Sequence, residues 1–203
     1  CGPDFRQQML REKIQLIHGV FFTHEHADHT AGLDDLRPFC YKIGDMPIYL
    51  DERTLESLEL RFQYIFSKEN RYPGAPSVTS NIVANAPFFV DDLKITPIEV
   101  MHGALPVTAY RFLDFAYLTD MKSITKQEKE KLKNLDVLVI NALRIEEHPT
   151  HLNLQEAFEF INEIQPKKTY FTHISHKLGF HAEVSKNLPK NVFLAYDGLK
   201  ISV

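Results

Sequence analysis

The segment from residue 23 to residue 32 has the residue types and spacing of a metal-binding loop. It reads Thr-His-Glu-His-Ala-Asp-His-Thr-Ala-Gly and follows a short apolar run. Side chains two residues apart at a strand end point the same way, so His24 and His26 can bind one ion. Asp28 and His29 come where the chain turns into a helix and can face a second ion. The alternative, four polar loop residues without a metal, requires a pattern that rarely arises by chance.

Three more residues with metal-ligand chemistry each follow a predicted strand. They are His102, Asp120 and His173. A lone histidine at a strand end is usually a surface residue or a satisfied core residue. Their recurrence after strands is nevertheless what a site along one rim of a sheet produces. Imidazole and carboxylate together favour zinc, manganese or iron over calcium or magnesium.

Short β-branched or aromatic runs alternate with helical periodicity along the chain. The predicted strands cover residues 16–22, 47–50, 94–100, 115–118, 137–140, 169–172 and 192–195. Helices are predicted over 55–66 and over 154–164, the latter with a capping box of Asn153 and Glu156. A second capping box, Thr125 with Glu128, predicts a charged surface helix. The aperiodic stretch 67–81 is a candidate lid. This alternation indicates an α/β fold.

Length and composition bound the class of protein. The 203 residues, 44% of them apolar, fit a single domain over 1–203. The chain begins with Cys1 in a Cys-Gly-Pro-Asp turn, so we expect an N-terminally incomplete domain. With 23 basic and 27 acidic residues, a net charge of -4 argues against bulk nucleic-acid binding. Two cysteines build no disulfide framework, and no apolar run reaches a membrane span. We therefore expect a cytoplasmic protein.

These motifs resemble the metallo-β-lactamase superfamily from His18 onward. The resemblance implies a four-layer αββα sandwich that lacks its N-terminal strands in this chain. It also implies two divalent metal ions per chain, zinc or manganese, bound by seven side chains. The implied ligands of one ion are His24, His26 and His102; those of the other are Asp28, His29 and His173, with Asp120 bridging the pair.

His151 distinguishes this chain within the superfamily. It lies in Pro-Thr-His-Leu-Asn, 22 residues before His173 and just before a predicted helix. This resembles the phosphodiesterase branch, which places a catalytic histidine that is not a ligand there. The branch includes the transfer-RNA 3′-processing nucleases and the bacterial phosphoribosyl 1,2-cyclic phosphate phosphodiesterases. The segments 170–176 and 195–199 resemble the second group most.

The resemblance implies hydrolysis of a small cyclic phosphodiester by a metal-bridged hydroxide. His151 would act as acid or charge stabiliser, and Asp28 would orient the hydroxide as well as bind metal. Three alternatives stay open: a transfer-RNA 3′ endonuclease, a thioester hydrolase and a non-catalytic binding scaffold. The first normally carries a basic arm, which is absent from this sequence. The expected partner is a small phosphodiester substrate; neither a membrane nor a nucleic acid is expected, and a homodimer is compatible with the sequence.

Overall fold

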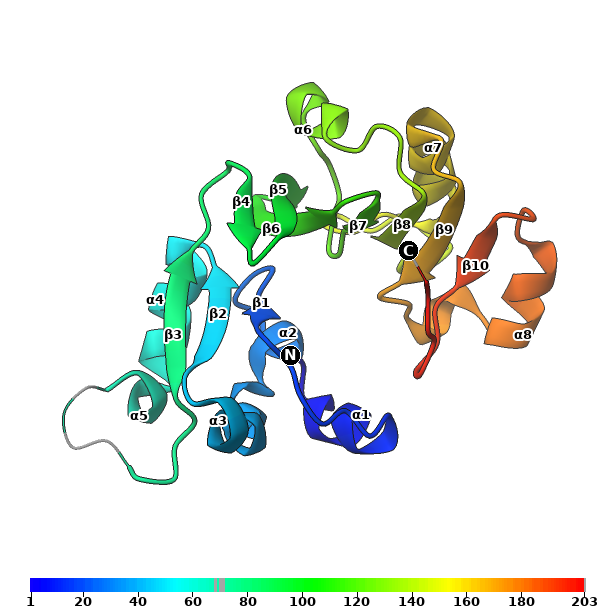
Figure 1. The fold of residues 1–203 in the computed structure, drawn as a ribbon. Coiled ribbons are helices and arrows are strands. Elements are labelled where there is room, and N and C mark those ends of the chain that lie inside the picture. The colour runs from blue at the N-terminus through cyan, green and yellow to red at the C-terminus, as the bar shows by residue number, and fades with distance from the viewer. Residues whose placement is uncertain (68, 70–71, 203) are drawn as a thin grey trace. The chain divides into compact units, whose positions relative to one another are not determined.

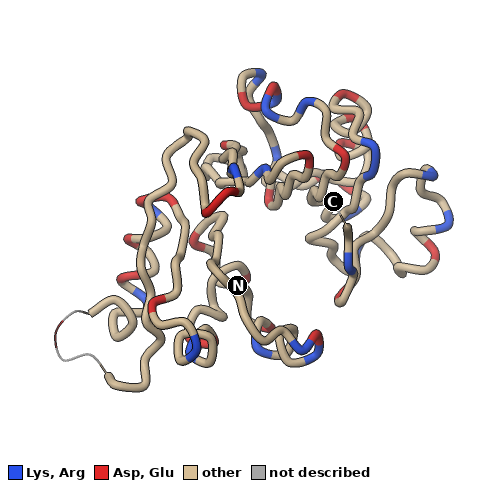
Figure 2. Tube along the Cα trace, viewed as in Figure 1, with Lys and Arg blue, Asp and Glu red and all other residues tan. Residues whose placement is uncertain are grey.

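The computed structural model describes residues 1–67, 69 and 72–202. The chain divides into two compact units, Cys1–Ala84 and Asn85–Val203, whose elements Figure 1 labels. Each unit has its own hydrophobic core. Figure 2 shows Lys and Arg interspersed with Asp and Glu in both units, in keeping with the mixed charge of the sequence. None of the helices in the described ranges is both long and apolar enough to cross a bilayer.

The first unit is built on a three-stranded parallel sheet of order β1-β2-β3. The central strand β2 (Met46–Leu50) buries Met46, Ile48 and Leu50 completely and leaves the residues between them half-buried, the alternation expected of a pleated strand. The remaining elements are α1 (Phe5–Arg11), β1 (Val20–Phe21), α2 (Ala27–Thr30), η1 (Leu33–Leu36), α3 (Arg37–Ile43), α4 (Glu52–Arg61), α5 (Gln63–Phe66) and β3 (Val78–Ile82).

The second unit contains a seven-stranded sheet of order β10-β9-β8-β7-β6-β5-β4. Its strands are β4 (Phe88–Val90), β5 (Leu93–His102), β6 (Leu105–Phe112), β7 (Phe115–Tyr117), β8 (Val137–Asn141), β9 (Lys168–Thr172) and β10 (Val192–Leu194). Its helices are α6 (Lys126–Glu130), α7 (Leu154–Ile164), η2 (His176–Leu178), α8 (His181–Val184) and η3 (Ser185–Asn187).

Strand direction in this sheet gathers several strand ends at one edge. Strands β7 to β10 are mutually parallel, and two antiparallel steps make β5 run the same way. Because the carboxyl ends of parallel strands meet at one edge, the residues that follow β5, β7, β8 and β9 lie along the same rim. His102, Asp120, Asn141 and His173 are at or just past these ends.

Most predicted strands are confirmed, and the structure adds others. Strand β1 is shorter than the predicted 16–22, and β3, β4 and β6 were not predicted. Strand β3 is polar and half-exposed, so it lacks an apolar alternation, and it occupies the end of the candidate lid. Residues 68 and 70–71 of that lid lie outside the described residues. Strand β6 pairs with β5 through a hairpin at Gly103, whose φ of +64° suits glycine.

Helix α7 begins as predicted, and Glu128 of α6 makes buried contacts that the sequence did not indicate. Asn153 and Glu156 form the reciprocal capping box of α7. Thr125 caps α6, but the carboxylate of Glu128 is buried and accepts hydrogen bonds from Glu99 N (2.8 Å), Asn85 Nδ2 (2.9 Å) and Lys131 Nζ (2.7 Å). The helix lies at the surface, as expected, and is anchored to β5 through Glu128, its one buried residue.

Replacement of Glu128 with glutamine should lower the free energy of unfolding at pH 7 by about 2 kcal/mol, because hydrogen bonds to a charged group are lost. Burial acts to raise the pKa of Glu128, but hydrogen bonds from Lys131, Asn85 and Glu99 outweigh it and lower the pKa. Because the pKa of Glu128 is lower in the folded than in the unfolded protein, the charged carboxylate stabilises the fold at pH values above its ordinary pKa. This stabilisation is lost as the pH falls through the pKa of the folded state. Urea unfolding should therefore show that the difference in unfolding free energy between the wild type and Glu128→Gln becomes smaller at acidic pH. Glu130→Gln, on the exposed side of α6, is the control and should change little.

Candidate metal centre

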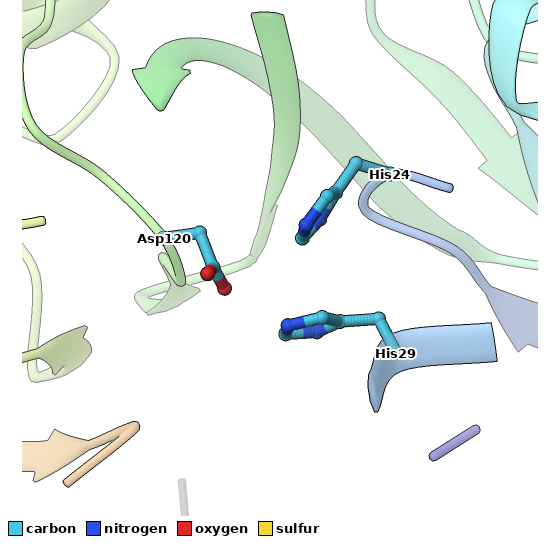
Figure 3. Close-up of side chains that lie close together, drawn as sticks. All are labelled: His24, His29 and Asp120. Carbon is cyan, nitrogen blue, oxygen red and sulfur yellow. The ribbon is translucent and has the colours of Figure 1, made fainter. Parts of the chain in front are cut away.

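In the first unit, the predicted metal loop follows β1 and brings three imidazole rings together. Phe22 N still donates to Tyr49 O of β2 (2.8 Å), which aligns the loop with the sheet. His24 is completely buried, and its Nε2 lies 3.0 Å from His26 Nδ1. The rings of His24 and His29 lie 4.4 Å apart, the latter carried by α2 (Figure 3).

The spacing of these nitrogens fits a metal ion. Two nitrogen ligands at about 2.0 to 2.1 Å from a tetrahedral ion are about 3.3 Å apart. The 3.0 Å between His24 Nε2 and His26 Nδ1 is close to this value. Asp28 Oδ2 lies 3.2 Å from His29 Nε2, and the Asp28 side chain is 61% exposed. His26 is also exposed, so solvent or a substrate can reach both Asp28 and His26.

The backbone of the metal loop is held by helix α4. Glu25, the residue between His24 and His26, pairs with Arg53 (Oε1 to Nη1, 2.6 Å). Arg61 Nη2 donates to the carbonyl oxygen of Glu25 (2.6 Å). The buried hydroxyl of Thr30 donates to His26 O (2.8 Å), which closes the loop onto α2. These contacts fix the loop before any ion binds. Sequence reasoning missed them because Arg53 and Arg61 resemble ordinary surface charges.

In the second unit, His102, Asp120, His151 and His173 meet at the rim of the sheet. His173 Nε2 lies 3.3 Å from Asp120 Oδ1, and His151 Nδ1 lies 3.5 Å from the same oxygen. The ring of His151 lies 4.4 Å from that of His102 and 4.9 Å from that of His173. Potential ligand atoms of His102, Asp120 and His151 all lie within 4.8 Å of one another. Asp120, which Figure 3 labels, is buried, and its Oδ2 accepts from Thr119 Oγ1 (2.7 Å).

The contact made by His102 fixes which of its nitrogens can bind a metal. His102 Nδ1 lies 2.8 Å from Thr150 O. A carbonyl oxygen only accepts, so Nδ1 carries the proton and Nε2 keeps its lone pair for a cation. The same contact holds the segment of His151 against the end of β5.

Two of these residues have a strained backbone. Asp120 has φ +55° and His173 has φ +52°. A left-handed conformation costs a residue with a Cβ roughly 1 to 2 kcal/mol, and such strain gathers at functional sites. Here it turns the chain immediately after β7 and β9.

The surroundings of His151 disfavour its protonated form in the metal-free protein. Burial lowers its pKa to about 4, the charge of Asp120 opposes this, and His173, His102 and His148 add to the lowering. The ring is therefore neutral at pH 7 in the metal-free protein. Its Nδ1 is buried without a hydrogen bond in the described part of the chain. Nδ1 lies 3.5 Å from Asp120 Oδ1, so a substrate could reach it without breaking a hydrogen bond.

Three other histidines lie close to this group or in the elements that follow it. The ring of His148 lies 4.9 Å from that of His151. His176 begins η2 directly after the segment of His173, and His181 begins α8 with its ring 6.1 Å from that of Tyr196.

The chain matches known proteins along most of its length. Residues 1–174 match the family model of the β-lactamase superfamily domain. A crystal structure described as a new diphosphatase from the PhnP family is 39% identical, with a TM-score of 0.91, covering 100% of this chain and 78% of that one. Zinc-bound PqqB from Methylobacterium extorquens, 18% identical with a TM-score of 0.74, covers 100% and 82% and supports the fold alone.

A curated relative carries a different kind of name. A protein of Porphyromonas gingivalis (strain ATCC BAA-308 / W83) named octanoyltransferase is 40% identical over 202 residues, which are 98% of this chain. The chain spans 41% of that protein's length. The family match and the similar structures confirm the α/β fold class expected from the sequence. The chain belongs to the β-lactamase superfamily and has the metallo-β-lactamase fold of the hydrolases in it.

Proposed function

We propose that this chain is a metal-dependent hydrolase that cleaves a phosphodiester, with a small cyclic phosphate of the phosphoribosyl 1,2-cyclic phosphate type as substrate. The observation that carries the proposal is the cluster around Asp120: one buried carboxylate oxygen faces both His151 and His173, beside a His102 whose tautomer suits a cation. The 39% identity to a diphosphatase supports chemistry at phosphorus.

The donor set of each unit fits divalent metal ions. Following the family resemblance, we assign one ion to His24, His26 and His102, and a second to Asp28, His29 and His173, with Asp120 shared. Imidazole nitrogens with a few carboxylates favour zinc or manganese. When bound, such ions supply a nucleophile at neutral pH by lowering the pKa of water, and they polarise phosphoryl oxygens.

The side chains of this chain would then divide the remaining work. The neutral ring of His151 donates a hydrogen bond to a phosphate oxygen or to the leaving oxygen, where negative charge develops. The exposed carboxylate of Asp28 accepts a hydrogen bond from the attacking water and orients it. Arg53 and Arg61 keep the loop of His24 and His26 in place and take no part in the chemistry.

A second candidate reaction is hydrolysis of a diphosphate bond. It is favoured by the relative described as a diphosphatase, which is 39% identical to this chain. Both reactions attack phosphorus and displace an oxygen leaving group, so the same residues serve either. They differ in the leaving group: an alcohol in the first case, a phosphate in the second. A phosphate leaving group needs less help from His151, because it is the weaker base.

The experiment is a substrate panel with protein reconstituted in zinc or manganese. The panel contains bis-p-nitrophenyl phosphate, a phosphoribosyl 1,2-cyclic phosphate, a dinucleoside diphosphate, an acyl thioester and a precursor transfer RNA. We expect hydrolysis of the cyclic ester, lost on chelation with EDTA and restored by metal. His18→Ala, which removes an exposed histidine outside the site, is the control and should be fully active. Thioester or RNA cleavage without hydrolysis of the small phosphates would contradict the proposal.

A further inference from the structure

Asn141 is a completely buried carboxamide at the end of β8, outside the predicted ligand set. Both ends of its side chain bind the backbone of one residue. Met121 N donates to Asn141 Oδ1 (2.8 Å), and Asn141 Nδ2 donates to Met121 O (3.0 Å). An amide is suited to this double contact because it offers a donor and an acceptor at once. The side chain thus grips the peptide groups on both sides of Met121.

Met121, whose backbone Asn141 binds, directly follows Asp120. Leu118 N is still paired with Val139 O of β8 (2.8 Å), and two residues later Asp120 takes its left-handed φ of +55°. Such a conformation persists only when its surroundings hold it, at a cost of roughly 1 to 2 kcal/mol. The two hydrogen bonds of Asn141 hold the chain at the exit of this turn. They therefore fix the direction in which the Asp120 carboxylate points.

The carbonyl of Met121 also joins the segment of His151. Leu152 N donates to Met121 O (2.9 Å), and Leu143 N donates to Leu152 O (3.0 Å). One carbonyl oxygen therefore accepts from Asn141 and from the residue after His151. Displacing this carbonyl would move Asp120 and His151 together.

We propose that Asn141 is a positioning residue that sets Asp120 and His151 in register for metal binding and turnover. The predicted effect on metal binding rests on the proposed function, whereas the positioning of Asp120 and His151 rests only on the hydrogen bonds of Asn141. Asn141 touches neither a reacting atom nor an ion; it acts through the backbone of Met121 and Leu152. A residue that supports ligands in this way typically changes metal affinity about 10- to 100-fold when replaced.

The test compares Asn141→Leu with Thr169→Val. Leucine has a similar volume and makes neither hydrogen bond. Thr169 is equally buried on the neighbouring strand β9, and its hydroxyl has no hydrogen-bond partner in the described part of the chain, so it matches Asn141 in burial alone. Zinc affinity is measured by competition with a chromophoric chelator, and the Co²⁺ absorption spectrum reports ligand geometry. Amide hydrogen exchange of Met121 and Leu152 is followed in the metal-free protein.

We expect Asn141→Leu to weaken zinc binding about 10- to 100-fold, to alter the cobalt spectrum, and to speed amide exchange at Met121 and Leu152. Thr169→Val should leave all three unchanged. Asn141→Thr adds no charge and keeps one hydroxyl that can hydrogen-bond to Met121, so it provides a milder variant with an intermediate loss if the leucine variant does not fold.

Two results would overturn the inference. In one, the Asn141 variants keep wild-type zinc affinity and wild-type exchange at Met121 and Leu152. In the other, Thr169→Val loses as much affinity as Asn141→Leu, which would make the effect one of general core stability. If the wild-type protein binds no zinc, the proposed function fails, but amide exchange in the metal-free protein still decides the role of Asn141.

Discussion

Replacement of His151 with alanine should lower kcat roughly 10²- to 10⁴-fold, the range typical of a lost proton-transfer or charge-stabilising group. Its ring faces Asp120 and lies 4.4 Å from that of His102 and 4.9 Å from that of His173. Under the proposed function, its loss removes a hydrogen-bond donor to a phosphate oxygen. The metal content of the variant should equal that of the wild type, because His151 is outside the proposed ligand set. Steady-state kinetics on the cyclic ester and elemental analysis of the same sample measure both quantities.

The His18→Ala variant is the control for loss of a histidine and should keep full turnover. A His151→Ala protein that loses an ion would make His151 a ligand, together with His102 and Asp120, whose potential ligand atoms lie within 4.8 Å of its own. A fall in kcat smaller than about tenfold would remove His151 from the chemistry.

Replacement of Asp120 with asparagine should have the larger effect on metal binding. The change keeps the volume of the side chain but removes the buried negative charge that faces His151 and His173. An amide offers a single neutral oxygen, which cannot hold two cations. We expect loss of at least one of the two ions and a fall in kcat/KM beyond the roughly 10- to 100-fold of a supporting residue.

Asp114→Asn is the matched control for Asp120→Asn. Asp114 lies in the same unit, its side chain is 63% exposed, and it pairs with Arg111 at the surface. That variant should retain both ions and normal turnover. If Asp120→Asn also retains two ions with unchanged affinity, Asp120 does not bridge them.

Secondary structure could be predicted where buried apolar residues recur at the spacing of a strand or a helix. Strand β8 and helix α7 were predicted nearly to the residue, because β8 is buried throughout and α7 has both a capping box and one apolar face. Strand β3 was missed because its pattern is half-exposed and polar, and its pairing with β2 comes from distant residues. The burial of Glu128 was not predicted for the same reason, because its partners Asn85 and Glu99 are distant in the sequence.

The candidate site could be proposed from residue types, but the residues that support it could not. Histidine and aspartate residues just after strand ends indicate metal-binding chemistry. The structure brings His102, Asp120 and His173 together around His151. Asn141 and Arg61 carry no such signal. Each acts on a backbone group 20 or 36 residues away, and only the fold shows that contact. The lowered pKa of His151 was likewise not predictable, because it follows mainly from the burial of the ring in the folded protein.

The proposed dinuclear site requires that each chain bind two ions. The direct measurement is inductively coupled plasma mass spectrometry of the wild-type protein after saturation with zinc or manganese and removal of unbound metal. Two ions per chain, falling to one or none in Asp120→Asn, are the predicted result. A wild-type chain that retains no ion, or one ion at most under saturation, would contradict the dinuclear site.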